Sequence, residues 1–194
     1  MSRDLTTLGH RVVSIDASWR MAQAAASAAP DIPVVVADGA ALPLVTGCSD
    51  LVVAYMSLHD MDEMQQAVME AARVLEPGGR LCIAVVHPIN SAGHFESLEP
   101  DSAFVIEGSY LEAHPYASRV ERDGLSMTFS SHHYPLGAYF EAIQAAGFVV
   151  EALREVPVGV ASSNAPRHER WRRLPLFLNV RAVKPSTEVL LGSP

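Results

Sequence analysis

Leu51-Val-Val-Ala-Tyr55 and Arg80-Leu-Cys-Ile-Ala-Val-Val86 are two apolar runs on either side of a helical segment, and they decide the fold. In the segment between them, over residues 64–75, apolar side chains recur at helical spacing: Ala67, Val68, Ala71, Ala72 and Leu75. Pro77-Gly78-Gly79 predicts a tight turn before the second run. A strand, a helix and a second strand in this order predict a parallel pair joined by a helical crossover.

The same alternation continues on both sides of this unit. We expect further strands at residues 11–15, 33–37, 148–156 and 176–183, and further helices at residues 18–29, where Ser18 is a suitable N-cap, and 136–146. The pattern predicts an α/β fold with a mostly parallel, doubly wound sheet, in a single domain covering residues 1–194. Residues 89–131 are irregular and are expected to form an insertion or lid of mixed structure. Residues 186–194 are expected to be a loose tail.

Composition excludes several classes of function. The 194 residues carry a net charge of -8, which disfavours nucleic acid as a partner because phosphate binding needs clustered cations. The apolar runs are too short to span a membrane. Cys48 and Cys82 lack the spacing of metal ligands and cannot form a disulfide framework, so we expect no metal site. Residues 1–7 contain no apolar signal segment, and the cytoplasm is the expected location.

Polar residues follow the predicted strands where ligands bind in an open parallel sheet, at the carboxyl ends. Asp16 is placed to accept hydrogen bonds from the two hydroxyls of a ribose; the alternative is that it only caps the next helix. Asp38, followed by Gly39, is placed to accept the amine of an adenine; the alternative is a solvated turn. Tyr55-Met56 and His87-Pro88 end the next two strands.

Taken together, these pieces resemble the class I S-adenosylmethionine-dependent methyltransferases. The stretches that carry the resemblance are Gly9 to Ser18, Val36-Ala-Asp-Gly-Ala-Ala-Leu-Pro-Leu44, Ser49 to His59 and Arg73-Val-Leu-Glu-Pro-Gly-Gly-Arg-Leu81. The order of Tyr134-Pro-Leu136, Gly147-Phe148 and Leu174-Pro-Leu-Phe-Leu178 is similar to the C-terminal antiparallel hairpin of the same family. The resemblance implies a Rossmann-like sheet and S-adenosylmethionine as cofactor.

The resemblance also implies roles for individual residues. Asp16 and the adjoining Ala17 would lie at the ribose, and Asp38 would bind the adenine amine with backbone contacts from Gly39 and Ala40. Three further residues would lie around the methionine part of the cofactor: Tyr55, Met56 and His59. Two of these three have an alternative role, since Met56 is also suited to the core and His59 also to a local pairing with Asp60 or Asp62.

One family feature has no counterpart in the sequence. The family's first strand, central in its sheet, ends in a glycine-rich loop, and residues 1–9 resemble only the end of the helix after that loop. We therefore expect a natural start upstream, or two half-sheets that close in another way. Without the central strand, exposed sheet edges predict a homo-oligomer or aggregation and weak cofactor binding.

A catalytic base is not required for methyl transfer, which depends mainly on alignment and on exclusion of water. The candidates for such a base are His87, His132 and His133, and His87 is equally explained as a strand-end residue held extended by Pro88. The insertion supplies aromatic residues that either cover a small organic acceptor or pack on the sheet edge. They are Phe95, Phe104, Tyr110 and Tyr116.

The predicted function is transfer of a methyl group to a small organic molecule. Two alternatives remain. The first is a non-catalytic, methyltransferase-like module for binding or regulation, which the absent glycine loop favours. The second is a nicotinamide-dependent reductase, which also ends its second strand in an acid but also needs a glycine loop. Against the second, neither Tyr110 nor Tyr116 is followed by a lysine four positions later.

Overall fold

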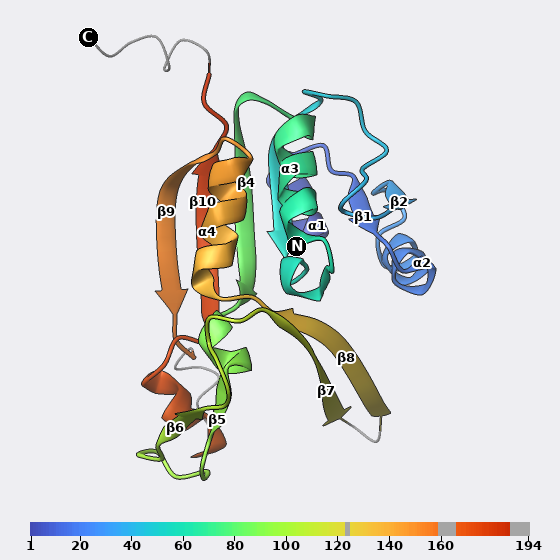
Figure 1. The fold of residues 1–194 in the computed structure, drawn as a ribbon. Helices are drawn as coiled ribbons and strands as arrows, with labels where there is room; N and C mark the ends of the chain where they lie inside the picture. The colour runs from blue at the N-terminus through green and yellow to red at the C-terminus, as the bar shows by residue number, and fades with distance from the viewer. Residues whose placement is uncertain (123–124, 159–165, 187–194) are drawn as a thin grey trace, which may run out of the picture.

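The computed structural model describes residues 1–122, 125–158 and 166–186, and shows an α/β fold (Figure 1). Its main sheet contains β3 (Ser49–Tyr55), β4 (Leu75–Val86), β10 (Phe177–Val183) and β9 (Val149–Val156), in that order across the sheet. β3 and β4 are parallel, whereas β10 is antiparallel to both of its neighbours. The predicted parallel pair and the predicted C-terminal antiparallel hairpin are both confirmed.

Helices α3 (Met64–Val74) and α4 (Leu136–Ala145) lie side by side over one face of this sheet (Figure 1). The apolar face of α3 is buried at the positions that the sequence pattern predicts, including Ala67, Val68 and Ala71. Ile143 of α4 and Leu81 of β4 are each only 1% exposed and belong to the same core. Burial of apolar side chains from the two helices and from β3, β4 and β10 is the main source of stability here.

A second, smaller sheet pairs β1 (Ser14–Asp16) with β2 (Val34–Val36) in parallel. The strands are connected by α2 (Trp19–Ala28), whose N-cap Ser18 accepts a hydrogen bond from the backbone N–H of Met21, as expected. This unit lies beside the main sheet, next to β3 and α3 (Figure 1). Helix α1 (Ser2–Thr7) precedes β1 and contains no buried residue.

Strands β1 and β3 face one another without pairing. Among the described residues, β1 pairs only with β2 and β3 only with β4, so the sheet is interrupted between them. We call the space between residues 13–17 and residues 51–55 the β1–β3 gap. The sequence-based expectation of a sheet without its central strand agrees with this arrangement.

The structure corrects two sequence-based expectations for residues 75–86: where the strand begins, and whether a turn precedes it. Strand β4 begins at Leu75 instead of Arg80, and the predicted Pro77–Gly79 turn is an irregularity within it, at which Gly78 has a φ of 86°. Residues 89–131, expected as an insertion or lid of mixed structure, lie largely in two hairpins. The first consists of β5 (Gly93–Phe95) and β6 (Phe104–Ile106), and the second of β7 (His114–Arg122) and β8 (Leu125–His133).

Three short 3-10 helices complete the description: η1 (Leu58–Asp60), η2 (Pro88–Ser91) and η4 (Pro166–Arg172). Most of the predicted tail, residues 187–194, lies outside the described residues. Within the part that the structure describes, no helix has the length and apolar character that crossing a membrane requires.

Lys184 fastens the end of β10 to the end of α3. Its ammonium donates hydrogen bonds to the carbonyl oxygens of Ala72 and Leu75, at 2.8 and 2.7 Å. These carbonyl oxygens lie at the C-terminal end of α3, where no backbone N–H of the helix is available to pair with them. We expect Lys184→Met to lower the free energy of unfolding by about 1.5–3 kcal/mol, the range for hydrogen bonds made by a charged group. Urea denaturation followed by circular dichroism measures this loss.

Arg80→Gln is the matched control for this variant. The Arg80 guanidinium pairs with Glu151 on the exposed face of the sheet, and such pairs contribute no more than about 1 kcal/mol. An equal loss of stability in the two variants would show that Lys184 is only another surface charge.

Candidate functional site

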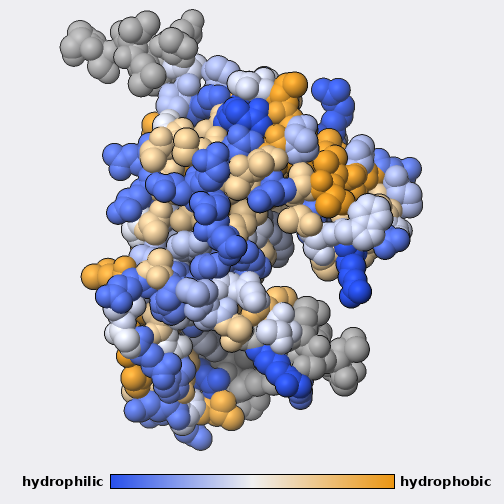
Figure 2. All heavy atoms as spheres, turned by 45° about the vertical axis from the view of Figure 1, so that its right-hand side comes forward, coloured by the Kyte–Doolittle hydropathy of each residue, from blue (hydrophilic) through white to orange (hydrophobic). Residues whose placement is uncertain are grey.

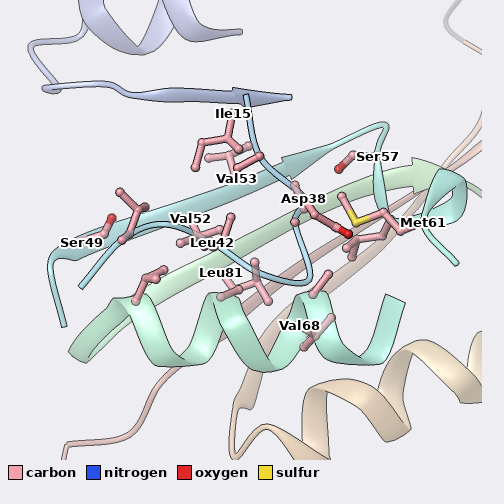
Figure 3. A pocket seen from close by; sticks show the side chains of 18 of the residues that line it. Ile15, Asp38, Leu42, Ser49, Val52, Val53, Ser57, Met61, Val68 and Leu81 are labelled. Carbon is pink, nitrogen blue, oxygen red and sulfur yellow. The ribbon is translucent and has the colours of Figure 1, made fainter. Parts of the chain in front are cut away.

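The candidate site lies at the carboxyl ends of β1, β2 and β3. Two hollows open there, on opposite sides of the β1–β3 gap. One, of about 390 Å³, is lined by Asp16, Tyr55 and Met56 among others. The other, of about 280 Å³, lies on the α3 side and is lined by Asp38 and Gly39 among others (Figure 3). Ser57 lines both hollows.

Asp16 ends β1 and already makes one local contact. Its Oδ1 accepts a hydrogen bond from the backbone N–H of Ser18 at 2.8 Å, which forms a local turn ahead of α2, while the N-cap of that helix is Ser18 itself. Among the described residues, its Oδ2 has no hydrogen-bond donor. Asp16 therefore keeps one carboxylate oxygen for a ligand.

Asp38 follows β2 in a similar arrangement. Its Oδ1 accepts a hydrogen bond from the backbone N–H of Ala40 at 2.9 Å, which folds the chain into a tight turn around Gly39. In Figure 3 its carboxylate points across the hollow toward Met61. A Cβ placed on Gly39 would lie 2.8 Å from Cε of Met61, so the backbone here is packed closely against that side chain. Any larger residue at position 39 would therefore push the Met61 side chain aside.

Glu70 and Arg73, which sequence reasoning missed, fix the loop after Asp38 onto α3. Glu70 accepts from the backbone N–H of Leu42 at 2.8 Å, and Arg73 donates to the carbonyl oxygens of Leu42 and Leu44. The two side chains also form a bidentate pair, with Nε to Oε1 at 2.6 Å, and this hydrogen bond from Arg73 lowers the pKa of Glu70. The sequence signal that could have identified this pair is a glutamate and an arginine three positions apart in a predicted helix.

The end of β3 turns sharply out of the sheet. Met56 has a φ of 52°, in the left-handed region that residues with a Cβ rarely adopt, and its backbone N–H donates to Ala84 of β4 at 2.7 Å. Tyr55, just before it, has a side chain that is 55% exposed. The predicted pair therefore borders open space, and Met56 is not a core residue of the sheet. Strained backbone of this kind concentrates at functional sites.

His59 is buried beside the site but does not line either hollow. Its Nε2 lies 3.6 Å from Oδ1 of Asp60, so the local pairing considered from sequence is present. Burial lowers the pKa of His59, and the neighbouring Asp60 carboxylate opposes that shift only in part. Nδ1 of His59 is buried without a hydrogen-bond partner among the described residues.

The three histidines considered as bases have other roles in the structure. His87 caps η2 by accepting from the backbone N–H of Ile89, and its Nε2 lies 2.9 Å from Glu155. His133 is fully buried between the Ser91 hydroxyl and the carbonyl oxygen of Tyr110, which occupy both ring nitrogens. His132 stacks on the ring of Tyr134. None of the three lines a hollow at the strand ends.

The aromatic residues of the insertion are accounted for mainly by packing. Phe95 and Phe104 form an edge-to-face cluster with Trp171 of η4, with ring centroids 4.9 to 6.2 Å apart. The Tyr110 hydroxyl accepts from the backbone N–H of Leu136 at the start of α4. Tyr116 lies near the base of the β7–β8 hairpin, where Ser131 donates to Asp60 of η1 at 2.6 Å. The hairpin is thus attached to η1.

Among the described residues, no group of three or more His, Cys, Asp or Glu side chains could hold a metal ion. Cys48 and Cys82 are free thiols. The site therefore consists of two carboxylates, a glycine turn and a strained strand end.

Comparisons with known proteins agree with this arrangement. Residues 1–83 match the family described as "Methyltransferase domain". An S-adenosylmethionine-dependent methyltransferase from Mesorhizobium loti superposes with a TM-score of 0.71, with 25% identity over 89% of this chain and 80% of that one. In its fold, and over residues 1–83 also in its sequence, the chain is therefore similar to the S-adenosylmethionine-dependent methyltransferases. The cofactor of this family is S-adenosylmethionine, and the methyltransferase-like sheet predicted from sequence is confirmed.

Two further relatives mark how far the likeness extends. A putative S-adenosylmethionine-dependent methyltransferase from Listeria monocytogenes has the same fold, with a TM-score of 0.74 at 17% identity over 91% of this chain and 80% of that one. A demethylmenaquinone methyltransferase from Renibacterium salmoninarum is 34% identical over 76 residues, which make up 39% of this chain and 32% of that protein. The match thus spans about a third of this curated relative.

Two of the buried histidines, His59 and His87, predict a loss of stability in mild acid. Burial lowers the pKa of both His59 and His87, so the folded state resists their protonation, while the unfolded chain takes up protons near the usual value of about 6.5. The free energy of unfolding should therefore fall as the pH drops below that value. Urea titrations between pH 7.5 and pH 5 measure this slope.

Single variants identify which histidines cause the pH dependence of the free energy of unfolding. We expect His59→Gln and His87→Gln each to flatten it, whereas His10→Gln, at an exposed position before β1, should leave it unchanged. A slope that both buried-site variants retain in full would locate the acid sensitivity elsewhere.

Proposed function

We propose that the chain transfers a methyl group from S-adenosylmethionine to a small organic acceptor. The observation that carries this proposal is the pair of carboxylates, Asp16 and Asp38, at the carboxyl ends of two adjacent parallel strands. Each carboxylate uses only Oδ1 in its local turn. Ligands in open parallel sheets bind at this edge.

The two carboxylates suit the two halves of an adenosine. Asp16 would accept from the ribose hydroxyls, beside the backbone of Ala17. Asp38 would accept from the adenine amine, while Gly39 and Ala40 contribute backbone contacts to the ring. The apolar lining of the hollow beside Asp38, which includes Leu42 and Met61, supports this assignment, because an adenine needs apolar contact on its faces as well as a polar partner at its edge.

The strained end of β3 would serve the other half of the cofactor. Tyr55 and Met56 line the hollow that also contains Asp16, so their backbone and side chains are proposed to border the methionine part. His59 is a buried residue of η1 and is proposed to stabilise that segment through Asp60 rather than to touch the ligand.

When bound, S-adenosylmethionine supplies an electrophilic methyl group on a positively charged sulfur that leaves as a neutral thioether. The protein's contribution is then alignment and exclusion of water, which can supply most of the acceleration in a reaction of this kind. His87, His132 and His133 are occupied by structural contacts, so we propose no dedicated base. The acceptor would have to bring a nucleophile that already has a free electron pair or that is acidic enough to lose its proton without a protein base.

The acceptor is proposed to be a small organic molecule held near η1 and the base of the β7–β8 hairpin. The Ser131–Asp60 hydrogen bond connects these two elements beside the strand ends. The curated relative from Renibacterium salmoninarum is named for a small-molecule acceptor, in keeping with this class. We place the reaction in the cytoplasm, in keeping with the free thiols.

The alternative of a non-catalytic binding module is favoured by one observation, the β1–β3 gap beside the site. Titration of the 194-residue chain with S-adenosylhomocysteine, followed by amide chemical shifts, separates the two functions and works even at weak affinity. Shifts at Ala17, Gly39 and Met56 are expected. Their absence at millimolar ligand would exclude cofactor binding by this chain.

Asp16→Ala tests the ribose assignment. We expect it to weaken binding of S-adenosylhomocysteine by about 1.5–3 kcal/mol, because hydrogen bonds to a charged group are removed while the fold keeps its Ser18 cap. Calorimetry or the same titration measures the loss. Asp31→Ala, an exposed acid before the opposite end of β2 that lines neither hollow of the candidate site, is the control and should bind like the parent. Equal affinity of the parent and Asp16→Ala for S-adenosylhomocysteine would contradict the assignment of Asp16 to the ribose.

Asp38→Ala tests the adenine assignment. We expect a smaller loss that depends on the base, since only the natural cofactor product has an exocyclic amine to donate. S-inosylhomocysteine, in which a carbonyl replaces that amine, should be affected less by the substitution. If both ligands lose affinity equally, Asp38 serves only to shape the turn that it forms with Ala40.

A further inference from the structure

The guanidinium of Arg170, in η4, lies among three aromatic rings. Its Cζ is 5.4 Å from the centroid of the Phe95 ring and lies over that ring. The Phe95 ring also makes edge-to-face contacts with Trp171 of η4 and with Phe104 of β6, at centroid distances of 4.9 and 5.1 Å. We call these four residues the Arg170 cluster. The cluster joins η4 to the β5–β6 hairpin.

The Arg170 guanidinium has no acceptor for its hydrogen bonds. Nε and Nη1 are buried, and neither has a hydrogen-bond partner among the described residues. In the same part of the chain, no carboxylate forms an ion pair with this side chain. A buried cation without an acceptor is rare, because it loses hydration without gaining a compensating bond. The contact with the Phe95 ring offsets only part of this loss.

Two acidic residues near the cluster already have partners. Oε1 of Glu169, the residue before Arg170, lies 3.9 Å from Nη1 of Arg172. Oε1 of Glu107, just after β6, lies 3.4 Å from Nδ1 of His94 on β5. Both elements of the cluster thus have an acid close by in sequence, and neither of these two acids neutralises Arg170.

Attachment of η4 to the hairpin does not explain Arg170 either. Nη1 of Arg173, just after η4, donates to the carbonyl oxygens of Pro100 and Ser102, at 3.2 and 2.9 Å. These two hydrogen bonds already hold the end of η4 against the loop between β5 and β6. The attachment therefore does not require the Arg170 guanidinium.

The Arg170 cluster is accessible to a ligand. All four side chains are only half-buried, and Nη2 of Arg170 is not enclosed as Nε and Nη1 are. The elements β5, β6 and η4 lie beyond the carboxyl end of β4 (Figure 1), and ligands bind at this end of an open sheet. In Figure 2 hydrophobic surface gathers on the side that carries β1 and β2, whereas the lower part of the molecule is mostly hydrophilic with separate hydrophobic spots. Such a surface suits a small ligand better than a broad apolar partner.

We propose that the Arg170 cluster binds a small organic carboxylate with a flat apolar body. The carboxylate would accept charge-assisted hydrogen bonds from the guanidinium, starting at Nη2, and the body would lie against the aromatic rings. Burial of Nε and Nη1 strengthens this attraction, because a charge away from water is less screened. The site is separate from the proposed cofactor site, since no residue of the cluster lines either hollow there.

A carboxylate fits the cluster better than a phosphate does. A phosphate carries up to two negative charges and is bound by several donors. Arg172 is paired with Glu169 and Arg173 donates to backbone carbonyls, so of these three arginines only Arg170 keeps an unpaired guanidinium. One guanidinium balances the single charge of a carboxylate, and the rings beside it favour an organic body over an inorganic ion.

The two tryptophans of the chain give a direct readout. Trp19, on α2, is 67% exposed and lies outside the cluster, so Trp19→Phe leaves Trp171 as the only fluorescent indole. We expect titration of this single-tryptophan chain with benzoate to change the emission of Trp171 in a saturable way. Benzamide, a neutral probe of the same shape, should bind about tenfold more weakly, because it cannot form a charge-assisted pair. No cofactor is needed, so the result is independent of the proposed function.

Variants made in the single-tryptophan chain test the role of the guanidinium. Arg170→Gln should weaken benzoate binding by about tenfold or more and remove the preference over benzamide. Arg170→Lys keeps the charge but not the planar fork, and should restore only part of the affinity. Arg172→Gln is the matched control, since its side chain is exposed and paired with Glu169, and it should bind benzoate like the single-tryptophan parent. The comparison of benzoate with benzamide stands without any variant at Arg170, should those chains fail to fold.

Three outcomes would overturn the proposal. A Trp171 emission that shows no saturable response to millimolar benzoate would mean that the cluster serves packing alone. Equal affinity for benzoate and benzamide, or unchanged benzoate affinity in Arg170→Gln, would show that the guanidinium is not the partner of the ligand. Tighter binding of inorganic phosphate than of benzoate would contradict the proposed ligand class.

Discussion

The parallel ladder between β3 and β4 is the interaction on which the rest of the molecule depends. It fixes Leu51 opposite Arg80 and Tyr55 opposite Ala84, and the other edge of β4 is fully occupied by β10. Like β10, β4 has both edges paired, and α3 and α4 pack against the sheet with side chains that are almost completely buried. Everything with proposed chemistry lies at the carboxyl end of this ladder or is attached to it.

The parts of the candidate site are held to the main sheet in different ways. The end of β3 is fixed by backbone hydrogen bonding to β4, whereas the turn that contains Asp38 is fixed from outside the small sheet, by Glu70 and Arg73 of α3. Asp16 has no such bond to the main sheet. Of the two carboxylates, Asp38 is therefore held to the larger core, while the position of Asp16 follows the small sheet.

Much of the fold follows from local pattern. The runs at residues 51–55 and 80–86 are short, β-branched and apolar, and α3 shows its buried face at regular spacing, so these elements could be predicted directly. Two features could not. Leu75 to Gly79 has the pattern of a helix end and turn, because a proline and two glycines conceal the early start of β4. The β7–β8 ribbon has no partner layer, so it lacks the apolar alternation that normally identifies strands.

The candidate site was predictable by position but not by contact. Strand ends located Asp16, Asp38 and the Tyr55–Met56 pair, because the edge of a parallel sheet brings such ends together. The histidines were different, since their roles depend on which distant groups surround them. His133 is set between Ser91 and Tyr110, and the sequence separations of 42 and 23 residues give no hint of either contact.

The left-handed backbone at Met56 has a consequence for the energetics of ligand binding. A residue with a Cβ in that conformation costs about 1–2 kcal/mol relative to an ordinary one. Folding offsets that cost here, because the hydrogen bond to Ala84 and the ladder behind it hold the turn in place before any ligand arrives. The strand end is thus shaped in advance, and a molecule that docks against it need not use its own interaction energy to bend the chain.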